Sequence, residues 1–249
     1  MKKNYKLLIL AAALLLSSCG SYKDIPYYQD LDRAAITQEA INNYQPAVIQ
    51  SSDILGINVS SRTPDQSAIF NYTSKDNQAT VSGYLVNAKG EVQLPLIGAL
   101  KVAGLTTTQV QEKMNGLLTT FYKDPVANVR ILNFKVAIYG DVLRPDIYTV
   151  KDEKISVTQA LTLAGDLNVT GMRKNVVLIR EEAGKRVYIP IDLTSKKIFQ
   201  SPYYYLKNND QIYVQPSQLK LATIDRGKTT SLVLSALSVV AIVFSVLYK

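Results

Sequence analysis

Histidine and tryptophan are absent from the 249 residues, and cysteine occurs only once, at Cys19. Histidine is the usual general base and metal ligand near neutral pH. Its absence, together with a single thiol, removes most metal sites and the Cys–His and Ser–His nucleophile pairs. We therefore expect neither a metal site nor a cofactor. A lone cysteine also excludes an intramolecular disulfide.

Carboxylates remain as catalytic candidates, because a glycosidase needs only a pair of them. Two adjacent pairs occur, Asp152-Glu153 and Glu181-Glu182, and each stands beside lysine or arginine in a predicted turn. Neighbouring charges in a turn are usually solvated. We therefore expect that the protein is not an enzyme, and we assign no catalytic residue.

Dense basic runs are also missing, although the formal net charge is +8. Nucleic-acid binding requires clustered lysine and arginine, so we expect no nucleic-acid partner. Three of the 28 basic residues, Lys2, Lys3 and Lys6, lie in a predicted signal peptide. Their removal leaves 25 basic against 20 acidic side chains and a net charge of +5.

The amino terminus has the pattern of a lipoprotein signal. A positive start is followed by the apolar run Leu7–Leu16 and then by Ser17-Ser18-Cys19-Gly20. An apolar run of about ten residues is typical of a secretory signal and is too short to span a bilayer. Leu16-Ser17-Ser18-Cys19 resembles a lipobox, in which the cysteine is acylated. We predict a signal peptide over residues 1–18 and a lipidated amino terminus with a linker over 19–45, with membrane lipid as a partner.

The carboxyl terminus contains eighteen uncharged residues, Ser231–Tyr248. A helix of that length would reach about 27 Å, which matches a bilayer core. We predict a transmembrane helix over residues 229–248. Serines fall on one face of this helix, which suits either helix packing or a polar lumen; they are Ser231, Ser235, Ser238 and Ser245. A plain membrane anchor remains the alternative.

The middle of the chain contains two segments with the same layout. Residues 90–95 are followed by 105–110, and fifty positions later residues 140–145 are followed by 155–160. In both, a threonine or serine (Thr106, Ser156) stands three residues before a glutamine, which predicts a capping box at a helix start. Each segment is therefore predicted to contain strands and one capped helix.

Apolar periodicity assigns the remaining elements. One face of the first helix is apolar, which predicts packing against a sheet. This face consists of Val110, Met114, Leu117, Leu118 and Phe121. Alternating or apolar runs predict strands at 126–132, 134–139, 175–180, 186–191 and 211–214. A short helix is predicted at 157–164. We expect the α+β class, with two small mixed β-sheet domains, each with a helix packed across it.

These residues resemble the outer-membrane polysaccharide export family. The start of its first domain is similar to Asp53-Ile54-Leu55-Gly56-Ile57-Asn58-Val59, and the later turns are similar to Gly90–Pro95 and Gly104-Leu105-Thr106. The following part resembles a soluble-ligand-binding β-grasp domain through Gly140-Asp141-Val142, Pro145–Tyr148 and Ala164-Gly165-Asp166. Asp146 and Asp166 stand where glycine is usual.

The resemblance implies an export domain over residues 46–132 and a β-grasp domain over 133–215. It also implies an oligomeric ring of identical subunits in the outer membrane, with periplasmic domains. Its substrate would be a capsular polysaccharide or exopolysaccharide, and its partner an inner-membrane co-polymerase. The four serines are then candidates to line the pore, and Tyr203, Tyr204 and Tyr205 to stack on sugars, although packing is the commoner role of such tyrosines. A membrane-anchored scaffold or carbohydrate-binding lipoprotein without its own pore is the alternative.

Overall fold

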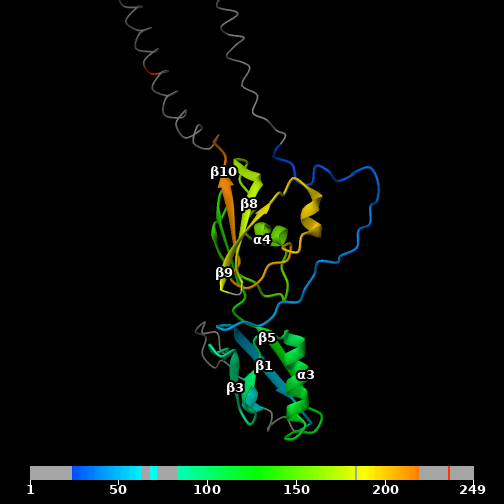
Figure 1. Cartoon of the computed structure of the whole chain (residues 1–249), viewed down its shortest axis with the longest axis vertical. Helices are drawn as coiled ribbons and strands as arrows, with labels where there is room; N and C mark the ends of the chain where they lie inside the picture. The colour runs from blue at the N-terminus through cyan, green and yellow to red at the C-terminus, as the bar shows by residue number, and fades with distance from the viewer. Residues whose placement is uncertain (1–23, 63–67, 72–82, 183, 219–234, 236–249) are drawn as a thin grey trace, which may run out of the picture.

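The structure, a computed structural model, describes residues 24–62, 68–71, 83–182, 184–218 and 235. Within this part of the chain two bodies follow one another along the long axis of the molecule (Figure 1). We refer to residues 46–132 as the first unit and to residues 133–216 as the second unit. Each unit encloses a hydrophobic core of its own, and Ile131 packs against both cores.

Two small sheets and a helix build the first unit. In the three-stranded sheet, the order is β2-β1-β5, and β1 pairs antiparallel with both neighbours. A separate hairpin pairs β3 with β4. The elements are β1 (Ile54–Ser60), the 3-10 helix η2 (Ala68–Phe70), β2 (Tyr84–Leu85), β3 (Glu91–Leu94), β4 (Gly98–Lys101), α3 (Thr107–Leu118) and β5 (Val126–Ile131). Alternate residues of β1 are buried, as expected for a sheet with one face against a core.

Helix α3 begins at the predicted capping box. The Thr106 side chain accepts a hydrogen bond from the Gln109 backbone, and the Gln109 side chain accepts one from the Thr106 backbone. The buried face is narrower than predicted: Leu117 and Phe121 are 41% and 47% exposed. The buried stripe at i, i+4 and i+8 leaves Leu117 at its edge, and α3 ends before Phe121.

The second unit is a single five-stranded sheet with the order β7-β6-β10-β8-β9. Its central strands β6 and β10 are parallel, and all other neighbours are antiparallel. The elements are β6 (Lys135–Gly140), β7 (Asp146–Thr149), α4 (Val157–Leu163), β8 (Gly171–Glu182), β9 (Lys185–Ile191), η3 (Lys196–Gln200) and β10 (Gln211–Pro216). The order along the chain, which is hairpin, helix, hairpin and final strand, fits the β-grasp-like unit that the resemblance implies.

Helix α4 also begins at its predicted capping box, formed by Ser156 and Gln159. Its buried residues Val157, Ala160 and Leu161 join the core below the sheet. Both predicted helix starts and the α+β class are therefore confirmed. The prediction of a mixed sheet in each unit is wrong for the first unit, in which every pairing of the described strands is antiparallel.

The two aspartates that replace glycine behave differently. Asp166 has a φ of 72°, in the left-handed region, and follows Gly165, whose φ is 76°. Aspartate tolerates this region better than most residues, so the turn after α4 keeps its geometry. Asp146 instead begins β7 and accepts a hydrogen bond from the Ile147 backbone.

Two sheet edges in the described residues, those of β5 and β9, are protected. The edge of β5 is capped by α3, because Asn115 accepts a hydrogen bond from the Ala127 backbone and Gln111 donates one to the Val129 carbonyl. Pro190 removes a backbone donor from the edge strand β9. Such devices oppose pairing with a strand of another chain.

The prediction of a transmembrane helix is contradicted by the structure. No helix in the described residues is long and apolar enough to cross a membrane. The longest of them, α3, has 12 residues, and at 1.5 Å per residue it covers roughly 18 Å, short of the roughly 30 Å of a bilayer core. The stretch for which the prediction was made, residues 229–248, lies outside the described residues except for Ser235.

Candidate binding cleft between the two units

The amino-terminal segment, residues 24–45, runs along the second unit before the chain enters the first (Figure 1). The backbones of Tyr28 and Gln29 donate hydrogen bonds to Leu193 and Thr194. Further along, the Asn43 side chain donates to the carbonyls of Phe199 and Ser201 at 2.8 and 2.6 Å. These contacts carry the segment to the junction of the two units.

Asp53 and Asn208 join the two units directly. Asn208 Nδ2 donates to Asp53 Oδ1 at 2.7 Å, and Asn208 Oδ1 accepts from the Lys135 backbone. On the other side, Asn133 accepts from the Ile54 backbone and donates to the Ser52 carbonyl. The junction is therefore held by amide side chains that each bridge two segments.

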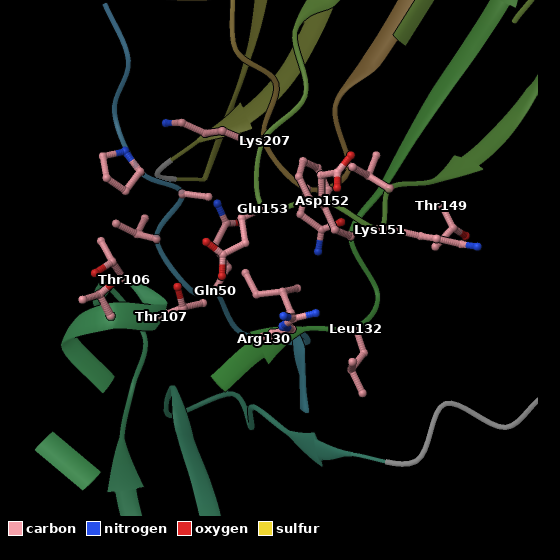
Figure 2. A pocket seen from close by; sticks show the side chains of 18 of the residues that line it. Gln50, Thr106, Thr107, Arg130, Leu132, Thr149, Lys151, Asp152, Glu153 and Lys207 are labelled. Carbon is pink, nitrogen blue, oxygen red and sulfur yellow. The ribbon is translucent and has the colours of Figure 1, made fainter. Parts of the chain in front are cut away.

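A cleft with a volume of about 470 Å³ opens at this junction. Figure 2 shows Thr106 and Thr107, at the start of α3, on one side, Lys151 and Asp152 on the other, and Arg130 between them. Tyr44 and Pro46 of the amino-terminal side, and Lys207 and Asn208 of the loop before β10, complete the wall. Pockets of 300–1,000 Å³ at domain junctions are common ligand sites.

Charges of both signs line the cleft. Arg130 and Lys151 stand with Asp152 and Glu153, and none of these four side chains forms a salt bridge or hydrogen bond with another described residue. Lys207 differs, since its ammonium group lies 2.6 Å from Glu182 Oε1. The unpaired groups include both donors and acceptors.

A second hollow of about 190 Å³ adjoins the cleft, sharing Tyr44, Ala47, Glu153 and Lys207 with it. Tyr203 and Tyr205 line this hollow, whereas Tyr204 does not. The Tyr205 ring meets Tyr44 edge to face, with centroids 5.1 Å apart. The two hollows therefore form one groove across the junction.

Tyr204 has a packing role. Its ring packs against the core of the second unit and against Phe199, and its hydroxyl shares a 3.1 Å hydrogen bond with Thr158. The structure thus separates the three tyrosines: Tyr203 and Tyr205 border the groove, while Tyr204 fixes their loop to α4.

The loop with these tyrosines rests on a buried ion pair. Arg180 donates to both oxygens of Asp210, at 2.9 and 2.7 Å, and to the Tyr205 carbonyl at 3.1 Å. Both charged side chains are almost fully buried, and the Arg180 guanidinium lies 5.6 Å from the centre of the Tyr203 ring. Arg180 therefore fixes the position of the loop that carries Tyr203 and Tyr205.

Comparison with known proteins assigns the first unit. Residues 42–132 match the family described as polysaccharide biosynthesis/export protein. We refer to this stretch, which is similar to that family, as the export domain. The predicted resemblance to the export family is thereby confirmed.

Two proteins named for polysaccharide export are similar to this chain. The EPS I polysaccharide export outer membrane protein EpsA of Ralstonia solanacearum is 28% identical over 142 residues, which cover 55% of this chain and 37% of that protein. The protein of the same name from Ralstonia nicotianae is 28% identical over 172 residues, covering 59% and 45%. The chain thus spans less than half the length of these curated relatives.

Within the export domain, Asp53 of the Asp53–Val59 motif has a structural role. One oxygen accepts from the Gln50 backbone at 2.8 Å, and the other accepts from Asn208. The side chain is buried, and burial raises the pKa of the Asp53 carboxyl above its usual value of 3.8. The hydrogen bonds from Gln50 and Asn208 act in the opposite direction.

The packing of the amino-terminal segment is a feature that sequence reasoning missed. Tyr27 donates a short hydrogen bond to Asp166, and its ring lies 5.4 Å from the Arg173 guanidinium carbon. Burial and the Asp166 carboxylate raise the pKa of Tyr27 well above its usual range. The paired Tyr27-Tyr28 in a stretch predicted as a linker was the available signal, because linkers seldom carry adjacent aromatics.

The other predicted site residues lie at the ends of the chain. Cys19, Ser231, Ser238 and Ser245 fall outside the described residues, and Ser235 is helical and exposed. In the described part of the chain, no three histidine, cysteine, aspartate or glutamate side chains are grouped so that they could hold a metal ion.

Proposed function

We propose that the protein is an outer-membrane polysaccharide export lipoprotein whose two units face the periplasm. The match of residues 42–132 to the export family carries this proposal. The names of the two EpsA relatives, which are polysaccharide export outer membrane proteins, support it. The protein acts by binding and passing polymer, without catalysis.

The position of the described amino terminus supports attachment through Cys19. Asp24 forms a 2.6 Å salt bridge with Lys174 in β8, and the Ser217 backbone donates to Thr170, just before β8. Both described ends therefore lie at the same end of the second unit (Figure 1). Cys19 precedes Asp24 by five residues, a reach of at most about 18 Å. An acyl group on Cys19 would hold this end of the second unit beside the membrane.

The same geometry directs the export domain away from the membrane. The first unit lies at the opposite end of the molecule from residues 24 and 217 (Figure 1). It would then be the part that meets an inner-membrane co-polymerase across the periplasm. In a ring of identical subunits, pairing through the edges of β5 and β9 is opposed by the side chains of α3 and by Pro190. Contacts would therefore be made through side chains on the faces of the units or through the other edge strands of the two larger sheets, β2 and β7.

Deletion of the gene tests the function, with complementation by the wild type and by Cys19→Ser. We expect the deletion strain to lose surface polysaccharide and to retain polymer in the periplasm. The Cys19→Ser protein should leave the outer-membrane fraction and fail to incorporate labelled palmitate. Normal surface polysaccharide in the deletion strain would refute the proposal.

A ligand-binding scaffold without export activity is the second candidate, and the cleft at the junction is the observation that favours it. Native mass spectrometry in mild detergent separates the two. An oligomer supports the export assembly, whereas a stable monomer supports the scaffold.

A further inference from the structure

We infer that the cleft between the two units binds a segment of uncharged glycan, with the chain lying across the junction in the groove. This inference rests on the proposed export function and adds to it a site and a substrate class.

The charge balance of the cleft favours an uncharged ligand. In the larger hollow, Arg130 and Lys151 are matched in number by Asp152 and Glu153, and the charge of Lys207 is neutralised by Glu182. The second hollow adds one cation, Lys154, whose ammonium group lies over the Tyr44 ring, 5.1 Å from the ring centre. An anionic sugar would approach two unpaired carboxylates as well as two cations. Clefts attract charged ligands when they carry one sign of charge, so this cleft has no electrostatic preference for an acidic polymer.

The mixture of donors and acceptors matches the chemistry of sugar hydroxyls. A hydroxyl group both donates and accepts hydrogen bonds. Arg130 and Lys151 can donate to it, and Asp152 and Glu153 can accept from it, without breaking any ion pair that the described residues form. Charged partners make the stronger hydrogen bonds.

An aromatic surface for the apolar face of a sugar ring is supplied by Tyr44. Its side chain is 39% exposed, and it lines both hollows. The neighbouring Asn43 is fixed to two carbonyls of the second unit. The Tyr205 ring stands nearly perpendicular to the Tyr44 ring, and the Lys154 ammonium lies over the Tyr44 ring, so a sugar would stack on the part that these two leave open. Tyrosine combines an apolar face with a polar tip, so Tyr44 can stack on a sugar ring while its hydroxyl group stays in contact with water.

The second hollow extends the groove beyond one sugar. It continues from Tyr44 to Tyr203 and Tyr205, which the buried pair of Arg180 and Asp210 holds in place. A chain of several sugar units would therefore contact residues of both units at once. Two of the three tyrosines predicted to stack on sugars would do so in this groove, and Tyr204 would not.

The experiment measures binding of two probes to the full-length chain in mild detergent. The first is a fragment of about six sugars, obtained by partial hydrolysis of the neutral fraction of the host's own exopolysaccharide. The second is an oligogalacturonate of the same length. Calorimetry gives the affinities, and tyrosine fluorescence provides a second signal because the chain lacks tryptophan. We expect the neutral fragment to bind at least tenfold more tightly than the acidic one.

Variants locate the site. Asp152→Asn with Glu153→Gln, and separately Tyr44→Ala, should each weaken binding of the neutral fragment about tenfold, whereas Tyr44→Phe should retain most of it. The matched control is Glu181→Gln with Arg186→Ala, a pair exposed on the β8–β9 hairpin. Circular dichroism confirms that each variant folds.

Three outcomes overturn the inference: no binding of the neutral fragment, equal binding by the cleft variants and the wild type, or tighter binding of the oligogalacturonate. None of these affects the proposed function, which the deletion strain tests separately. A deletion strain with normal surface polysaccharide would instead refute the export function and leave the binding result standing.

Discussion

Replacing Gly140 with alanine should destabilise the second unit strongly. Gly140 ends β6, has a φ of 98°, and lies where the chain passes the parallel neighbour β10. A Cβ atom built on it would stand 2.1 Å from the Val214 carbonyl oxygen. That oxygen belongs to the backbone of the central strand, so the contact cannot be relieved by a side-chain rotation.

The magnitude has two parts. A positive φ costs an L-residue about 1–2 kcal/mol. Displacing the Val214 carbonyl also breaks its 2.9 Å hydrogen bond from the Asp141 backbone, which contributes roughly 0.5–1.5 kcal/mol. We therefore expect Gly140→Ala to lower the free energy of unfolding by about 1.5–3.5 kcal/mol, with further loss if β6 and β10 separate.

The control is Gly184→Ala in the β8–β9 turn of the same sheet. Gly184 has a φ of 73°, but no heavy atom lies within 4 Å of its built Cβ. It should lose only the conformational part, about 1–2 kcal/mol. Urea unfolding of the full-length chain, followed by circular dichroism and tyrosine fluorescence, compares the two. Equal losses in both variants would show that Val214 does not contact the added methyl group, and the argument would fail.

Three further predictions concern buried polar groups. Burial raises the pKa of Asp53 above its usual value of 3.8. Between pH 3.8 and the raised pKa, the folded protein binds more protons than the unfolded one, so stability falls as the pH rises through that window. Asp53→Asn should remove this part of the pH dependence in urea titrations, and an unchanged slope of stability against pH would contradict it. Asp210→Ala leaves the buried Arg180 charge unpaired and should lower the free energy of unfolding by about 3–5 kcal/mol. Glu181→Gln, at an exposed ion pair, should lower it by less than about 1 kcal/mol. Similar losses of stability in the two variants would contradict this prediction. Ser156→Ala removes the cap of α4 and should lower the free energy of unfolding by about 1 kcal/mol, a shift measurable as a lower urea midpoint.

Local sequence patterns were sufficient where the interactions are local. The capping boxes at Thr106 and Ser156 were readable because their partners lie three residues away. The strands followed from alternation and from apolar runs, since side chains on a strand point to opposite faces. The order of weak motifs likewise indicated the resemblance to the export family, which residues 42–132 match.

Patterns were less reliable at the margins of elements. Periodicity placed Leu117 and Phe121 on the buried face of α3, but both are exposed. The width of a buried stripe depends on how far the sheet extends beneath the helix, and that extent is a property of the packed unit. At the carboxyl terminus, the apolar stretch predicted a membrane-spanning helix that the described structure does not contain.

The cleft and its surroundings were decided by tertiary structure alone. Asp53 and Asn208 are 155 residues apart and share a 2.7 Å hydrogen bond, while Tyr44 meets Tyr205 from a segment predicted as a linker. Neither pairing has a periodic signature, because periodicity records which face of one element is buried and not which distant element covers it. The sequence by itself determined the two helices, most strands and the resemblance of the first unit to the export family. Only the folded chain determined how the two units meet, and therefore where a ligand could lie between them.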